Sequence, residues 1–148
     1  MSYIVNEREC QRLEVSSRKE WLLTNGIGGF ASGTVAGINT RRYHGLLVAA
    51  VAPPAGRQVL LASVDAFVQT NGDRVGISSN QYPGAIYPEG FLHLRSFSVG
   101  DDAEWTYSIG NVKAIRRLSM HQGRNAVTLR YENKGERGFR LILRPLIS

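Results

Sequence analysis

Three segments in the second half of the chain alternate between apolar and polar side chains, and this pattern constrains the fold most. In one of them, Trp105, Tyr107 and Ile109 are separated by Thr106 and Ser108. Because successive side chains of a β-strand point to opposite faces, a period of two gives each strand one apolar face. The alternating segments are residues 105–109, 127–131 and 139–143, and Gly-, Asn- and Asp-containing turns precede or separate them at residues 100–102, 110–111, 122–125 and 133–138. Closely spaced strands of this kind predict an all-β fold, an antiparallel β-sandwich with little helix.

The first half of the chain is less regular but also favours strands. Residues 20–24 read as a strand that runs into a glycine loop at residues 25–29, and residues 43–51 form an apolar run. Residues 59–70 are long enough for two strands or one bent strand, and a tight hairpin turn is expected at residues 71–73. The length of 148 residues matches a single domain spanning 1–148.

The charge, the cysteine content and the hydropathy indicate the cellular setting. The net charge is +6, but the basic residues are scattered, with Arg-Arg doublets only at residues 41–42 and 116–117. A scattered positive charge is typical of a solvated surface, so no nucleic-acid partner is expected. The lone Cys10 cannot form a disulfide within the chain, the N-terminus lacks a signal pattern, and the longest apolar run, residues 46–52, is too short to span a membrane. We therefore expect a cytoplasmic protein with no membrane association.

The glycine loop at residues 26–31 fits the relaxed dinucleotide fingerprint G-x-G-x-x-A. A nucleotide site of this type needs a helix directly after the loop and an acidic residue about twenty positions further on. Residues 32–37 are poor helix formers, and residues 46–54 contain no carboxylate. The sequence therefore predicts a backbone loop that needs positive φ angles, and no cofactor.

A polar cluster at residues 39–45 is the main candidate site. It contains Asn39, Arg41, Arg42, Tyr43 and His44 between two apolar stretches. Arginine offers forked donors for carboxylates or sugar hydroxyls, tyrosine can stack, and histidine can move protons. The alternative is structural, with the arginines paired to local carboxylates and the imidazole satisfying backbone groups. The residues alone leave both interpretations open.

The segment 80–91 is a second candidate, because its three aromatic side chains, its amides and Glu89 could form a sugar platform. Its alternative is a structured loop whose aromatic residues pack on the sandwich. A glycosidase needs two suitably spaced carboxyl groups, and no pair is indicated by the spacing of the acidic residues. The three histidines also lack metal-ligand spacing, so no catalytic residue and no metal site are predicted.

Residues 20–48 closely resemble the opening of bacterial and archaeal-type glycogen debranching enzymes (amylo-α-1,6-glucosidases), and the resemblance continues through residues 53–61, Asp65 and residues 143–146. The resemblance implies an N-terminal β-sandwich of the supersandwich type that is followed by a catalytic helical (α/α) toroid, which hydrolyses α-1,6-glucosidic branch points of glycogen. That toroid is not in these 148 residues, so no catalytic residue is carried over. The chain stops directly after a predicted strand, and we expect it to end inside the family's β-domain, where an unpaired strand could join another copy as a homo-oligomer.

The sequence thus favours a non-catalytic domain that docks the toroid of the same polypeptide and helps bind glycogen or a maltooligosaccharide. The resemblance favours a functional role for the 39–44 cluster, and we expect the cluster to line the junction with the toroid. One alternative is a stand-alone carbohydrate-binding module that uses Trp105, Tyr82 or Tyr87. A further alternative is a basic β-barrel that binds single-stranded nucleic acid.

Overall fold

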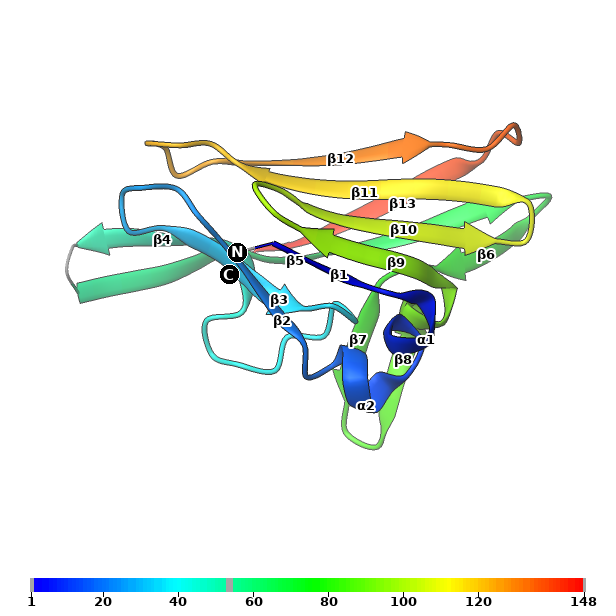
Figure 1. The fold of residues 1–148 in the computed structure, drawn as a ribbon, viewed down its shortest axis with the longest axis horizontal. Helices are drawn as coiled ribbons and strands as arrows, with labels where there is room; N and C mark the ends of the chain where they lie inside the picture. Colours follow the sequence, from blue (N-terminus) through cyan, green and yellow to red (C-terminus); the bar gives the residue numbers. More distant parts are fainter. Residues whose placement is uncertain (1, 53–54, 148) are drawn as a thin grey trace.

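The computed structural model describes residues 2–52 and 55–147, which form two antiparallel sheets packed face to face (Figure 1). The strand order is β1-β9-β10-β11-β12 in the first sheet and β13-β5-β4-β3-β2 in the second, with β6 added beside β5. Within the described residues both sheets remain open at their edges. The predicted antiparallel sandwich is therefore confirmed, and the closed arrangement of the nucleic-acid-binding alternative does not form.

The first sheet is built largely from strands that follow one another in sequence. Its strands are β1 (Tyr3–Val5), β9 (Leu94–Val99), β10 (Ala103–Ile109), β11 (Val112–Met120) and β12 (Val127–Asn133). In β10 the side chains of Trp105 and Tyr107 are buried, while Thr106 and Ser108 are only partly covered. The alternation in the sequence therefore identified the inward face of this strand correctly.

The second sheet contains the least regular part of the sequence. Its strands are β2 (Glu20–Thr24), β3 (Phe30–Thr34), β4 (Gly45–Ala52), β5 (Ala55–Thr70), β6 (Asp73–Gly76) and β13 (Arg140–Ile147). The long apolar segment is one strand of 16 residues, β5, which pairs with β4, β6 and β13. The predicted tight turn joins β5 to β6, with φ angles of +49° at Asn71 and +84° at Gly72. Positive φ at both central residues is the type I′ requirement that Asn-Gly satisfies.

A third, two-stranded sheet projects from the sandwich beside the short helices (Figure 1). It pairs β7 (Ser79–Tyr82) with β8 (Ala85–Glu89), so the expected loop at residues 80–91 is mostly a hairpin. The helical content is limited to α1 (Glu7–Cys10), α2 (Leu13–Ser16) and the 3-10 helix η1 (Gly90–His93). Little helix was predicted, and these one-turn helices are too short to show a helical period in the sequence.

The core between the sheets is organised around two tryptophans. Trp21 of β2 meets Trp105 of β10 edge to face at 5.4 Å, and Phe97 of β9 lies 5.1 Å from Trp105. Such aromatic pairs contribute roughly 0.5–1.5 kcal/mol each beyond the area they bury. Gly33 lies opposite Trp21, where a Cβ would make a tight contact of 3.2 Å with the indole. Cys10 is also buried, and burial raises the pKa of its thiol to about 11, which makes it unreactive.

Candidate functional site

The 39–44 cluster lies in the connection between β3 and β4, directly before β4 begins at Gly45. Its residues are exposed from Asn39 to Tyr43, whereas His44 is only 4% exposed. The loop therefore presents its polar residues outward and is tied to the body of the domain at its last residue.

The buried imidazole of His44 holds the loop through both ring nitrogens. Its Nδ1 accepts hydrogen bonds from the backbone N–H of Thr40 at 2.9 Å and of Arg41 at 3.2 Å. Because Nδ1 accepts, the ring proton is on Nε2, which lies 2.8 Å from Oε1 of Glu20 and donates to it. Neither nitrogen is left to move a proton to or from a substrate, so His44 is a structural anchor in this arrangement.

Glu20, the first residue of β2, connects the imidazole to an exposed guanidinium. Arg41 donates from Nε to Oε1 of Glu20 at 2.5 Å and from Nη2 to Oε2 at 3.0 Å. The pKa of the Glu20 carboxyl is lowered, and the hydrogen bond from Arg41 is the main cause. Partial burial opposes this shift, and the hydrogen bond from His44 adds to it. The Arg41 side chain remains 69% exposed although its orientation is fixed.

The rest of the loop adds a cation–π pair and an anchor to the neighbouring strand. The guanidinium carbon of Arg42 lies 5.3 Å from the ring centre of Tyr43, and both side chains are exposed. Asn39 donates from Nδ2 to the carbonyl oxygen of Ala62 in β5 at 3.1 Å. The loop thus presents two arginines and a tyrosine in defined positions, which suits recognition of another surface or of hydroxyl groups.

The structural and functional interpretations of this cluster are therefore compatible. Arg41 is paired with a local carboxylate and His44 satisfies backbone groups, while the guanidinium still faces solvent beside a surface hollow. That hollow has a volume of about 320 Å³ and is lined by Ser17, Arg18, Glu20, Thr40 and Arg41. It contains one carboxylate, whereas hydrolysis of a glycoside uses two. The cluster has the composition of a binding surface.

The sequence profile of the family described as "Glycogen debranching enzyme N terminal" matches residues 19–148. The chain belongs to this family. Its matched region includes both Glu20 and the 39–44 loop, together with the two sheets except β1. No curated protein and no solved structure matches the chain. An N-terminal domain of a larger enzyme implies a catalytic domain in the same polypeptide.

The glycine loop of this family member has the conformation expected of a backbone turn. Gly26 and Gly28 have φ angles of +82° and +91°, and strand β3, not a helix, follows. The buried Asn25 organises the loop, because its Oδ1 accepts from the N–H groups of Ile27 and Gly29 at 3.0 and 2.9 Å. A dinucleotide fingerprint places the N-terminus of a helix at this position, where the chain instead continues as strand β3.

The same Asn25 joins the two sheets at one end of the sandwich. Its Nδ2 donates to the carbonyl oxygen of Arg124 and to Oδ1 of Asn125, both at 3.0 Å. Its own carbonyl oxygen accepts from the N–H of Gly123 at 2.6 Å. The β2–β3 and β11–β12 turns are therefore joined by three hydrogen bonds.

The structure separates the aromatic residues that were considered for sugar contact. Trp105 is 1% exposed in the core, so its suggested role in binding sugar is wrong. Phe91 is also buried, at 4% exposed, whereas Tyr82 and Tyr87 are 52% and 68% exposed. The packing interpretation therefore holds for one of the three aromatics in the 80–91 segment, and the other two remain candidates.

An interaction that sequence reasoning missed joins two segments of the family resemblance. Asp65, 2% exposed in β5, accepts from Nη2 of Arg144 in β13 at 2.8 Å and from Nδ2 of Asn80 in β7 at 2.8 Å. Asp65 and residues 143–146 each stood out in the sequence, but 79 positions separate the partners. No local pattern connects them.

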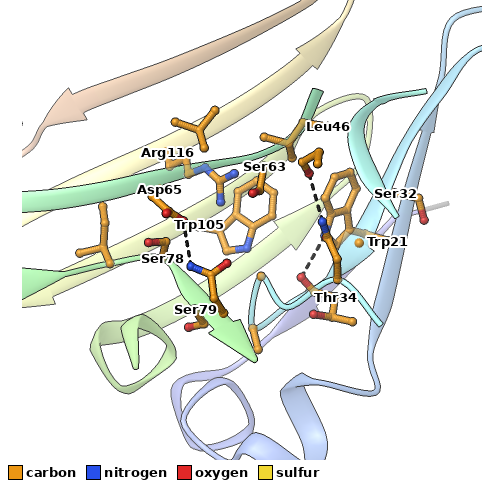
Figure 2. Close-up of a pocket in the computed structure, with 18 of the residues that line it drawn as sticks. Trp21, Ser32, Thr34, Leu46, Ser63, Asp65, Ser78, Ser79, Trp105 and Arg116 are labelled. Atoms are coloured by element: carbon orange, nitrogen blue, oxygen red, sulfur yellow. Dashed lines mark hydrogen bonds between the residues drawn. The ribbon is translucent and has the colours of Figure 1, made fainter. Parts of the chain in front are cut away.

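A small, partly open cavity lies between the sheets next to Asp65 (Figure 2). Figure 2 shows Trp21 and Trp105 side by side, with Arg116 near the second indole; its guanidinium carbon lies 4.4 Å from a Trp105 ring centre. The cavity volume is about 30 Å³, room for about two water molecules. This volume is too small for a glucose unit.

Two further findings concern membranes and metals. Within residues 2–52 and 55–147, no helix has the length and apolar character needed to cross a membrane. In the same residues, no group of three or more His, Cys, Asp or Glu side chains is placed to hold a metal ion.

Proposed function

We propose that this domain docks the catalytic (α/α) toroid of the same polypeptide, in an enzyme that hydrolyses α-1,6-glucosidic branch points of glycogen in the cytoplasm. The docking surface is the 39–44 loop together with Glu20. This surface borders the substrate cleft and helps to bind glycogen or maltooligosaccharide. The family match supports the parent enzyme's substrate, and the loop geometry supports the docking surface.

The observation that carries this proposal is that the Arg41 side chain is both fixed and exposed. A side chain that is free in solution loses rotamer entropy when a partner binds. Arg41 is already fixed by two hydrogen bonds to Glu20 and yet is 69% exposed. Its remaining N–H donors, with the neighbouring Arg42–Tyr43 pair, are therefore ready for a partner's carbonyl or carboxylate oxygens at low entropic cost.

The test uses the full-length enzyme with Arg41→Ala and Arg42→Ala, singly and combined. We expect weaker branch hydrolysis of glycogen, a lower thermal midpoint of the domain–toroid unit, or both. Arg130→Ala is the matched control, because Arg130 is an exposed arginine of β12 away from the loop. If hydrolysis and stability both remain at the level of the control, the proposal is wrong. A loss of stability alone would assign the loop to docking without a role at the cleft.

A stand-alone carbohydrate-binding module is the second candidate function. The exposure of Tyr82 and Tyr87 favours it. It predicts that a protein of this size, without a toroid, occurs in the source cells, which immunoblotting with an antibody against the domain would detect.

A further inference from the structure

The β7–β8 hairpin carries two exposed tyrosines on one face. Tyr82 is paired with Ala85 across the hairpin, and Tyr87 follows Ala85 by two residues. Side chains two apart share a face of a strand, and along β8 the side chains of Ala85 and Tyr87 are exposed while those of Ile86 and Pro88 are more covered. Tyr87 therefore lies on the exposed face that Ala85 shares with Tyr82, next to a shift in the pairing of the two strands. Their exposed fractions of 52% and 68% leave both rings largely uncovered. Large aromatic side chains that lie together at the surface are typical of binding sites.

The hairpin is firmly attached to the sandwich at its base. The N–H of Gly90 donates to the carbonyl oxygen of Ser78 at 3.0 Å, and the N–H of Phe91 donates to Oγ of Ser79 at 3.1 Å. Asn80 is held by the buried Asp65. A base fixed in this way positions the two rings before any ligand arrives, which reduces the entropic cost of binding.

A fixed guanidinium is linked to the base of the hairpin through Asp65. Arg144 is held by Asp65 and is nevertheless 66% exposed. The pKa of Arg144 is raised mainly by its hydrogen bond and charge interaction with Asp65, against a small burial effect, and the nearby Tyr82 adds to the increase. Asp65 also holds Asn80, two residues before Tyr82, so the Arg144 guanidinium is tied to the base of the hairpin.

These groups match the chemistry of a pyranose chain. The C–H faces of sugar rings are apolar and pack on aromatic rings, while their paired hydroxyls accept from a guanidinium and donate to a carboxylate. An open surface hollow of about 440 Å³ at the hairpin is lined by Gln81, Tyr82 and Glu89, with Gly84, Ala85 and Ile86, and Tyr87 lies outside its lining. The carboxylate of Glu89 in that hollow disfavours phosphate-bearing ligands and so favours a neutral, hydroxyl-rich one.

We propose that the Tyr82–Tyr87 face of the hairpin, with Arg144, binds a chain of an α-glucan at a site distinct from the 39–44 loop. The site holds an outer chain of the branched polymer while another part of it is processed. The choice of α-glucan rests on the proposed function, whereas the preference for a neutral sugar chain rests on the hairpin itself.

Affinity electrophoresis of this chain in gels with and without glycogen tests the proposal, with titration by maltoheptaose for affinity. We expect glycogen to retard the wild-type chain, and Tyr82→Ala or Tyr87→Ala to weaken binding about fivefold to tenfold. Phenylalanine at either position should retain most of the affinity because the ring is kept. Arg130→Ala is the control, since Arg130 is an exposed residue of β12 outside both proposed surfaces.

Several results would overturn this site. One is a wild-type chain that glycogen does not retard. Another is a Tyr82→Ala/Tyr87→Ala double variant that binds maltoheptaose as tightly as the wild type, and a third is an equal loss in Arg130→Ala. If the double variant keeps glucan affinity but the full-length enzyme loses domain–toroid stability, the hairpin is a protein contact and the glucan site is refuted. Glucan binding that is lost in the tyrosine variants but unchanged in Arg41→Ala would support the hairpin site even if the docking proposal failed.

Discussion

Removal of the His44 side chain should destabilise the domain measurably. The imidazole makes two hydrogen bonds to backbone N–H groups and one to the carboxylate of Glu20. A neutral hydrogen bond contributes roughly 0.5–1.5 kcal/mol and one to a charged group roughly 1.5–3 kcal/mol. Thr40 and Arg41 are exposed, so their N–H groups regain water when the ring is lost. We therefore expect His44→Ala to lower the free energy of unfolding by about 3 kcal/mol.

Two polar variants separate the contributions of the ring nitrogens. In His44→Asn the amide oxygen can replace Nδ1 as the acceptor for the loop, whereas in His44→Gln the amide nitrogen can replace Nε2 as the donor to Glu20. His44→Asn should recover more of the lost stability, because it preserves two of the three hydrogen bonds. Urea denaturation followed by the fluorescence of the buried Trp21 and Trp105 measures these differences. A loss below about 0.5 kcal/mol in His44→Ala, or a better recovery by Gln than by Asn, would refute the anchoring role.

Three other perturbations follow from the geometry and the pKa shifts. Gly90→Ala should destabilise the domain by at least about 2 kcal/mol, because its Cβ would lie 2.1 Å from the carbonyl oxygen of Ile77; Gly138→Ala, whose Cβ would meet nothing within 4 Å, is the control in urea denaturation. The lowered pKa of Glu20 stabilises the fold above the ordinary value of 4.5 and loses this effect as the pH falls through the lowered pKa. As the pH falls below 4.5, the free energy of unfolding of Glu20→Gln should therefore decrease less steeply than that of the wild type. Burial raises the pKa of Tyr107 from 10.0 to about 12, against the opposing charge of Arg116. Stability should fall as the pH rises from 10.0 to about 12, and absorbance at alkaline pH should show a tyrosine that ionises only on unfolding.

The strands were predictable where packing imposes a local pattern. The inward residues of β10 follow the period of two, and the Asn71-Gly72 turn is set by the backbone angles that these two residues tolerate. The hairpin β7–β8 was harder to predict because Pro83 and Pro88 interrupt its sequence and several of its side chains are exposed on both faces. A strand that buries little has no alternation to detect.

The interactions of the candidate site were not predictable, because their partners are distant in sequence. Glu20 and His44 are 24 positions apart, and Asp65 and Arg144 are 79 positions apart. The sequence indicated which residue types gather at residues 39–44. It could not show that His44 is buried and Arg41 exposed, because that division depends on β2 lying beside the loop.

The pairing of β5 with β13 has a consequence for synthesis of the chain. The strands β9 to β12 pair with their neighbours in sequence, so each hairpin of the first sheet can close as soon as it leaves the ribosome. By contrast, one edge of β5 pairs with residues 140–147. During translation this long apolar edge stays open while the whole first sheet is made, and an open strand edge attracts other strands. Slow or interrupted translation after β12 should therefore favour association between nascent chains.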